Sequence, residues 1–228
     1  MPTAFDEITL GYKIASIGLE IGRSVFNQAR SWRNKSDHRF ISSLTTFEFI
    51  QQGNDQIAHY VQDRTAKITK DNTRMPPFQY GSAGQDQFGN ILITLGDPPQ
   101  TTEYAHRIIE RQQGMNKIGI FEDLEFSKDT ILRCVLTATS INGYATADEN
   151  YTFYVQHWTD VSTIFMIFPR ERLPQNLNVK YSALGETQWH PVTREKNELR
   201  QFTGGRKAFI LEAKNPPIGH RYKIAWRW

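Results

Sequence analysis

The sequence predicts a mainly β fold: an antiparallel β-sandwich, or a barrel-like sandwich, that carries an N-terminal α-helix. Aromatic residues make up 12% of the 228 residues, and such residues favour strands. Apolar runs of strand length are separated about every ten residues by Gly, Pro, Asn and Asp, which is typical of a sandwich or barrel. Near the N-terminus, the apolar residues instead recur with helical spacing.

The predicted helix covers residues 11–33, where apolar side chains from Ile14 to Trp32 recur every three or four residues. Gly18 and Gly22 are four residues apart and therefore share one face of this helix. Each glycine costs a helix about 1 kcal/mol relative to alanine. We therefore predict a close backbone neighbour for both glycines, which is either the protein's own sheet or a partner helix in a homo-oligomer.

Residues 1–39 are thus predicted to form the helix and a linker, and residues 40–228 to form the β-sandwich domain. This domain could consist of two packed β halves that meet near residues 125–130. Its first part is predicted to contain a hairpin around a Gly-Asn-Asp turn, a long loop and two short strands, with one stretch that fits either a helix or a strand. In order, these are Ile41–Gln52 with Ile57–Ile68, the loop Asp71–Gly89, the strands Asn90–Gly96 and Lys117–Phe121, and the ambiguous stretch Thr101–Gln113.

The later part of the chain has a clearer strand pattern. Thr163–Phe168 is almost wholly apolar and ends at a proline, which predicts a central strand covered on both faces. Gly204-Gly205 is predicted to separate two strands. The remaining predicted strands are Thr130–Ser140, Tyr151–Trp158, Leu177–Tyr181, Ala208–Ala213 and Arg221–Trp228.

Charge and cysteine content exclude several classes of protein. The formal net charge is +3, from 27 cations and 24 anions, and a nucleic-acid-binding protein usually has a denser basic stripe. The single cysteine excludes a disulfide framework and a cysteine-based zinc site, and it fits a reducing, cytoplasmic location. The first eight residues lack the basic and apolar regions of a signal peptide. The six histidines are scattered and no phosphate-binding loop is present, so we predict no metal and no cofactor.

The strongest catalytic pattern is Glu212-Ala213-Lys214 at the end of a predicted strand. It resembles the half-site of Mg²⁺-dependent nucleases of the restriction-enzyme type, which also need a metal-binding aspartate on an earlier strand. That aspartate is missing here, so a nuclease that uses Glu212 and Lys214 is only an alternative. Ser82 lacks the sequence of a nucleophile elbow, and Cys134 lies inside an apolar strand. The sequence therefore predicts a protein that is not an enzyme.

The last strand instead predicts a binding surface. Strand alternation places Tyr222, Ile224, Trp226 and Trp228 on one face, which should face the core, and basic residues on the other face. This basic face could bind an acidic partner, and an ordinary solvated strand face is the alternative reading. The predicted binding residues are Arg206, Lys207, Lys214, Arg221, Lys223 and Arg227.

The stretch from Asn215 to Trp226, in which Pro and Gly precede a Tyr-x-Ile-x-Trp strand, resembles the closing strand of β-sandwich accessory modules of bacterial signalling and defence proteins. This resemblance implies a prokaryotic, cytosolic and non-enzymatic setting. The predicted function is accordingly a binding or regulatory module that acts through protein or ligand contacts. A pore-forming protein is the other alternative, because a basic, aromatic-rich β domain behind an amphipathic helix is also the layout of actinoporin-like toxins.

Overall fold

The structure is a computed structural model that describes residues 36–112, 115–193 and 195–228. Within these ranges the elements are strands, apart from one 3₁₀ turn at Thr203–Gly205, which confirms the predicted mainly β chain. No helix in the described ranges is long and apolar enough to cross a membrane. The predicted helix, with Gly18 and Gly22, lies outside the described residues, so its predicted backbone neighbour stays a prediction.

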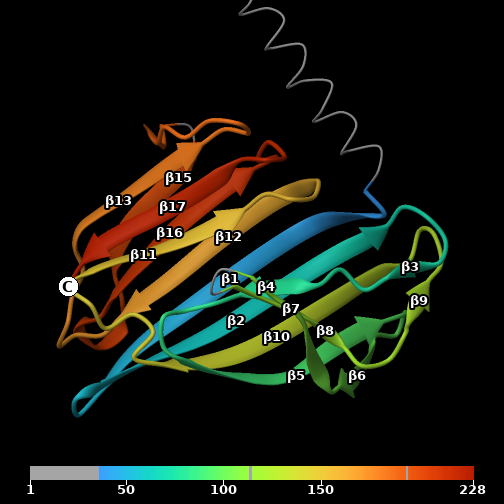
Figure 1. Cartoon of the computed structure of the whole chain (residues 1–228), viewed down its shortest axis with the longest axis horizontal. Coiled ribbons are helices and arrows are strands. Elements are labelled where there is room, and N and C mark those ends of the chain that lie inside the picture. Colours follow the sequence, from blue (N-terminus) through green and yellow to red (C-terminus); the bar gives the residue numbers. More distant parts are fainter. Residues whose placement is uncertain (1–35, 113–114, 194) are drawn as a thin grey trace, which may run out of the picture.

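The largest sheet has eight strands in the spatial order β15-β16-β12-β1-β2-β10-β5-β6. Figure 1 shows it as the broad twisted layer that runs the length of the molecule. In chain order its strands are β1 (His38–Gln52), β2 (Asp55–Ile68), β5 (Gln85–Leu95), β6 (Gln100–Tyr104), β10 (Ile131–Ile141), β12 (Thr159–Phe168), β15 (Lys196–Gln201) and β16 (Lys207–Lys214).

Three smaller sheets complete the fold. The four-stranded sheet has the order β11-β17-β13-β14, the three-stranded sheet has the order β4-β8-β7, and β3 pairs with β9. Their strands are β3 (Thr73–Arg74), β4 (Phe78–Tyr80), β7 (His106–Gln112), β8 (Met115–Ile120), β9 (Glu125–Phe126), β11 (Asp148–Tyr154), β13 (Gln175–Ser182), β14 (His190–Pro191) and β17 (Arg221–Arg227).

Strand direction in the eight-stranded sheet differs from the prediction of an all-antiparallel fold. β1 and β12 pair in parallel, from Phe40 beside Thr159 to Glu48 beside Ile167, whereas the other pairs are antiparallel. A parallel pair needs a long connection between its strands, and more than a hundred residues separate these two. Strands from both sides of residues 125–130 share this sheet, because β10 lies between β2 and β5.

Aromatic side chains fill the space between the eight-stranded and four-stranded sheets. The ring centroids of Phe47 on β1 and Tyr151 on β11 are 4.7 Å apart. Trp226 on β17 lies 5.6 Å from Phe49 and 5.8 Å from Phe168, centroid to centroid. Phe49 and Phe168 are 1% and 0% exposed, so this contact is fully buried within the core. Side chains of both sheets therefore contribute to one aromatic core.

The structure also tests several of the predicted strands and loops. Tyr222, Ile224 and Trp226 are buried, which confirms the predicted core face of the last strand. Residues 163–168 belong to β12, which is central as predicted, although only its last residues are buried on both faces. The loop predicted for 71–89 is wrong in part, because it contains β3, β4 and the start of β5. The ambiguous stretch 101–113 contains β6 and β7.

Candidate functional site

The six basic residues predicted as a binding surface lie on two different sheets. Arg221, Lys223 and Arg227 belong to β17 in the four-stranded sheet. Lys207 and Lys214 are the two ends of β16 in the eight-stranded sheet, and Arg206 directly precedes that strand. The structure therefore divides the predicted surface into two groups, since pairing in different sheets separates β16 from β17.

Three of the six cations are paired with carboxylates. Such pairs on the surface contribute about 0–1 kcal/mol each, but they reduce the charge that a partner would meet. The pairs are Arg206 Nη1 with Glu48 Oε1 at 2.6 Å, Lys214 Nζ with Glu212 Oε1 at 3.6 Å and Arg227 Nε with Asp148 Oδ1 at 2.9 Å. No carboxylate of the described residues lies within ion-pair distance of Arg221 or Lys223.

Arg221 and Lys223 lie beside the same indole ring on the outer face of the four-stranded sheet. The guanidinium carbon of Arg221 is 5.2 Å from the ring centroid of Trp189, and Nζ of Lys223 is 5.9 Å from it. Arg221 Nη2 also donates to Ser182 Oγ at 2.9 Å and to the main-chain oxygen of Glu186 at 2.8 Å. These contacts hold the guanidinium in place without neutralising it.

A third cation, which sequence reasoning missed, belongs to the same face. Lys180 on β13 is the register partner of Lys223 on β17, so their side chains leave the same face of the sheet. Directly opposed like charges destabilise a strand pair, and no carboxylate of the described chain is within ion-pair distance of Lys180. The alternation of Leu177, Val179 and Tyr181 could have placed Lys180 on the basic face. We call Lys180, Arg221, Lys223 and Trp189 the basic sheet face.

The residues considered for catalysis do not assemble in the described part of the chain. The carboxylate of Glu212 faces Lys214 at 3.6 Å, and no group of three or more His, Cys, Asp or Glu side chains there could hold a metal ion. Burial raises the pKa of the Cys134 thiol to about 12, so this thiol remains protonated within the core. These observations leave the nuclease alternative without a metal site among the described residues.

Comparisons with known proteins give a likeness of fold. No protein-family model matches the chain, and no curated protein matches it significantly. Its fold is similar to the crystal structure of a "putative protease" from Parabacteroides distasonis ATCC 8503, with a TM-score of 0.51 and 8% sequence identity. The similarity covers 84% of this chain and 40% of that chain, so this chain spans less than half of that protein's length. At this identity the match shows a shared fold alone.

Proposed function

We propose that this protein is a non-enzymatic binding module whose basic sheet face docks an acidic segment of a protein partner. The observation that carries the proposal is the cross-strand pair of Lys180 and Lys223, two like charges that no described carboxylate neutralises. Such a pair lowers the stability of the strand pairing by a few tenths of a kcal/mol to about 1 kcal/mol. A bound carboxylate would remove that cost, so the arrangement favours an anionic partner.

The spacing of the cations favours an extended peptide segment. Arg221 and Lys223 are two residues apart on one strand, which places their Cα atoms about 7 Å apart. Alternate side chains of an extended acidic segment have the same spacing. The face is short, because the next outward cation on β17, Arg227, is paired with Asp148. A nucleic acid would require a longer basic stripe than this one.

The proposal includes three finer points. The eight-stranded and four-stranded sheets constitute a β-sandwich, which the aromatic contacts between β1, β11 and β17 support. The protein works in the cytoplasm of a bacterium, which the single thiol and the resemblance of the closing strand support. Gly18 and Gly22 contact a partner helix in a homo-oligomer or the protein's own sheet, as their spacing predicts.

We expect a fluorescein-labelled peptide with Glu at alternate positions to bind the intact protein with an affinity that falls as salt is raised. The double variant Lys180→Gln with Lys223→Gln should weaken binding at least tenfold, because it removes two of the three unneutralised charges of the basic sheet face. Fluorescence anisotropy at two salt concentrations measures both effects.

The matched control is Arg227→Gln, which removes a cation of the same sheet that is already paired with Asp148. Its affinity for the peptide should stay within twofold of the unchanged protein. Equal binding by the double variant and the unchanged protein would contradict the proposal. A single-stranded oligonucleotide of equal charge that binds more tightly than the peptide would also contradict it.

A further inference from the structure

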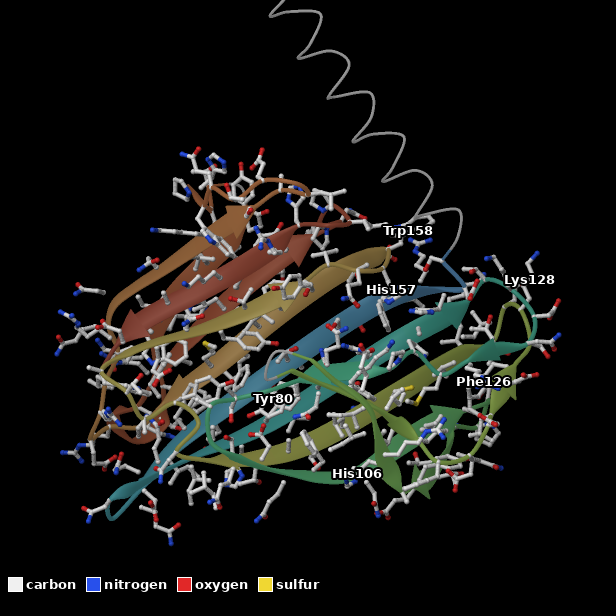
Figure 2. All side chains as sticks on the ribbon, in the orientation of Figure 1. Tyr80, His106, Phe126, Lys128, His157 and Trp158 are labelled. Carbon is white, nitrogen blue, oxygen red and sulfur yellow. The ribbon has the colours of Figure 1, made fainter. Side chains whose placement is uncertain are left out.

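A small cavity lies between the eight-stranded sheet and the edge of the four-stranded sheet, and its volume is about 80 Å³. Side chains of β1, β2 and β12 line one side of it, and β11 with the following residues 155–157 lines the other. Figure 2 shows His157, one of the lining residues, close to the point where β12 begins. A space of this size can hold several water molecules or one small ion.

Arg64 on β2 is the one lining residue with a permanent charge, and no Asp or Glu is among the lining residues. Its Nη1 donates to the main-chain oxygen of Pro77 at 2.8 Å. Its guanidinium carbon is 4.8 Å from the ring centroid of Phe78 and 5.1 Å from that of Phe40. A guanidinium has five N–H donors, so one neutral acceptor uses only a small part of its capacity.

The absence of an acidic partner distinguishes Arg64 from other arginines of the same sheet. Arg39 donates through two nitrogens to both carboxylate oxygens of Asp160, at 2.8 and 2.7 Å. Arg133 does the same with Asp63, the residue that directly precedes Arg64. Asp63 points to the opposite face of the strand, as the alternation requires. Among the described residues, no carboxylate lies within ion-pair distance of Arg64.

The titratable groups close to Arg64 include the imidazoles of His38 and His157, and Asp37, which is paired with Lys70, is the carboxylate that acts on both imidazoles. Burial is the main cause that lowers the pKa of His157 to about 4 and that of His38 to about 3, and the positive charge of Arg64 lowers both further. Both imidazoles are therefore neutral near pH 7. Burial also lowers the pKa of Arg64, which indicates the cost of keeping a cation there. Among the residues that line the cavity, Arg64 is therefore the one that carries a charge near pH 7.

Polar groups around Arg64 can complete the coordination of an oxygen-containing ligand. Thr45 and Ser162 are among the lining residues, and the Thr45 side chain is hydrogen-bonded to Tyr151. Gln62 is 6% exposed, and its Nε2 donates to Thr45 Oγ1 at 3.4 Å. Its Oε1 has no hydrogen-bond partner, but it is an acceptor and therefore does not bind a carboxylate oxygen. Burial raises the pKa of Tyr151 to about 12, so this lining phenol keeps its proton and can donate it. The cavity thus combines one cation with several neutral hydrogen-bonding groups.

We propose that this cavity binds the carboxylate group of a small organic acid, with the guanidinium of Arg64 as its principal partner. A carboxylate carries the single negative charge that the cavity lacks, and its planar shape suits the donors of a guanidinium. A phosphate dianion would bring one charge more than Arg64 neutralises. This site is independent of the basic sheet face, which lies on the outer side of the four-stranded sheet.

The test is a titration of the full chain with sodium acetate, followed by NMR of the histidine ring protons, with sodium chloride at equal ionic strength as the reference. We expect saturable shifts of His157, which lines the cavity, and none of His59, which is exposed on β2. Arg64→Gln should raise the dissociation constant of acetate at least tenfold. The control Arg133→Gln, which breaks the outward ion pair with Asp63, should leave it within twofold.

If Arg64→Gln does not fold, the test uses Arg64→Lys, which keeps the charge but loses the paired donors, and should bind acetate more weakly than the unchanged protein. Three results would overturn the proposal: shifts of His157 that follow ionic strength rather than acetate, acetate affinity that is unchanged in the Arg64 variant, or inorganic phosphate that binds more tightly than acetate through Arg64. None of these results depends on whether an acidic peptide binds the basic sheet face.

Discussion

Phe49→Ala should lower the free energy of unfolding by about 3–5 kcal/mol, the usual cost of removing a buried phenylalanine side chain. Phe49 is 1% exposed and lies where the eight-stranded and four-stranded sheets meet. Rigid aromatic neighbours surround it, so the structure can close only part of the cavity that the substitution leaves. Its ring contacts are Phe47, Tyr144, Phe168, Trp226 and Trp228. Equilibrium unfolding in urea, followed by tryptophan fluorescence, measures the loss.

The matched control is Phe121→Ala, which removes the same side chain from a position that is 62% exposed. Its free energy of unfolding should stay within about 0.5 kcal/mol of the unchanged protein. If both variants lose similar stability, the aromatic contacts between the sheets do not form the centre of the core. If Phe49→Ala lowers the free energy of unfolding by less than about 1 kcal/mol, that result would also contradict the prediction.

Lowering the pH from 7 to 4 should destabilise the protein through His38 and His157. The ring centroids of these residues are 4.2 Å apart, and burial depresses their pKa values from 6.5 to about 3 and about 4. An unfolded chain takes up these protons near pH 6.5, whereas the folded chain does not, so the free energy of unfolding falls as the pH falls through this window. His157 alone should account for about 2–3 kcal/mol.

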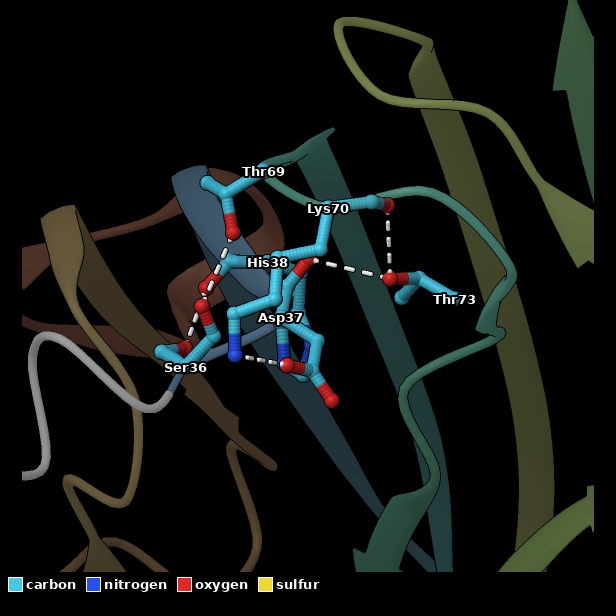
Figure 3. Close-up of polar contacts among 6 residues, drawn as sticks. All are labelled: Ser36, Asp37, His38, Thr69, Lys70 and Thr73. Carbon is cyan, nitrogen blue, oxygen red and sulfur yellow. Dashed lines mark hydrogen bonds and ion pairs between the residues drawn. The ribbon is translucent and has the colours of Figure 1, made fainter.

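The charged groups near the two imidazoles act in opposite directions. Arg64 and Lys117 oppose the protonation of His157, and Asp37 favours it. Asp37 is itself held by Lys70, whose Nζ is 2.6 Å from Asp37 Oδ1, and Figure 3 shows this pair beside His38 at the start of β1. The carboxylate is therefore partly neutralised, and burial with the nearby cations keeps the imidazoles uncharged.

Urea unfolding at pH 7, 5.5 and 4 tests this pH dependence. His157→Gln should flatten the profile, because it removes a buried imidazole whose pKa is depressed to about 4 in the folded chain. His59→Gln, at an exposed position of β2, should keep the profile of the unchanged protein. An unchanged profile in His157→Gln would show that other groups cause the acid sensitivity.

The sequence predicts well those features that depend on local alternation. The buried face of β17 follows from the spacing of Tyr222, Ile224 and Trp226, because one strand contributes all three residues. The direction of a strand and the identity of its neighbours in the sheet depend on residues far away in the sequence. The parallel pairing of β1 with β12 could therefore not be predicted from the sequence of either strand. The division of the six predicted cations between two sheets has the same origin.

The two sites differ in how visible they are in the sequence. Lys180 lies at a position of β13 whose side chain points away from the core. Strand alternation alone could therefore have added it to the predicted basic residues. By strand alternation, Arg64 lies on the same face of β2 as the buried residues Tyr60, Ala66 and Ile68. A charged residue at such a position breaks the apolar pattern of that face, so the sequence alone could have drawn attention to it. That no carboxylate of the described residues lies within ion-pair distance of Arg64 depends on the three-dimensional arrangement, which the sequence pattern does not contain.

The parallel pairing of β1 with β12 also has a consequence for synthesis of the chain. During translation, β1 and β2 can form their hairpin early, but β12 begins only at Thr159, long after the hairpin ends at Ile68. Until then the β12 side of β1 is an unpaired strand edge, and Phe49 lacks its contact with Trp226 until β17 is also synthesised. Non-local pairing of this kind favours slow folding, and the exposed edge of β1 favours incorrect strand pairing before β12 is in place.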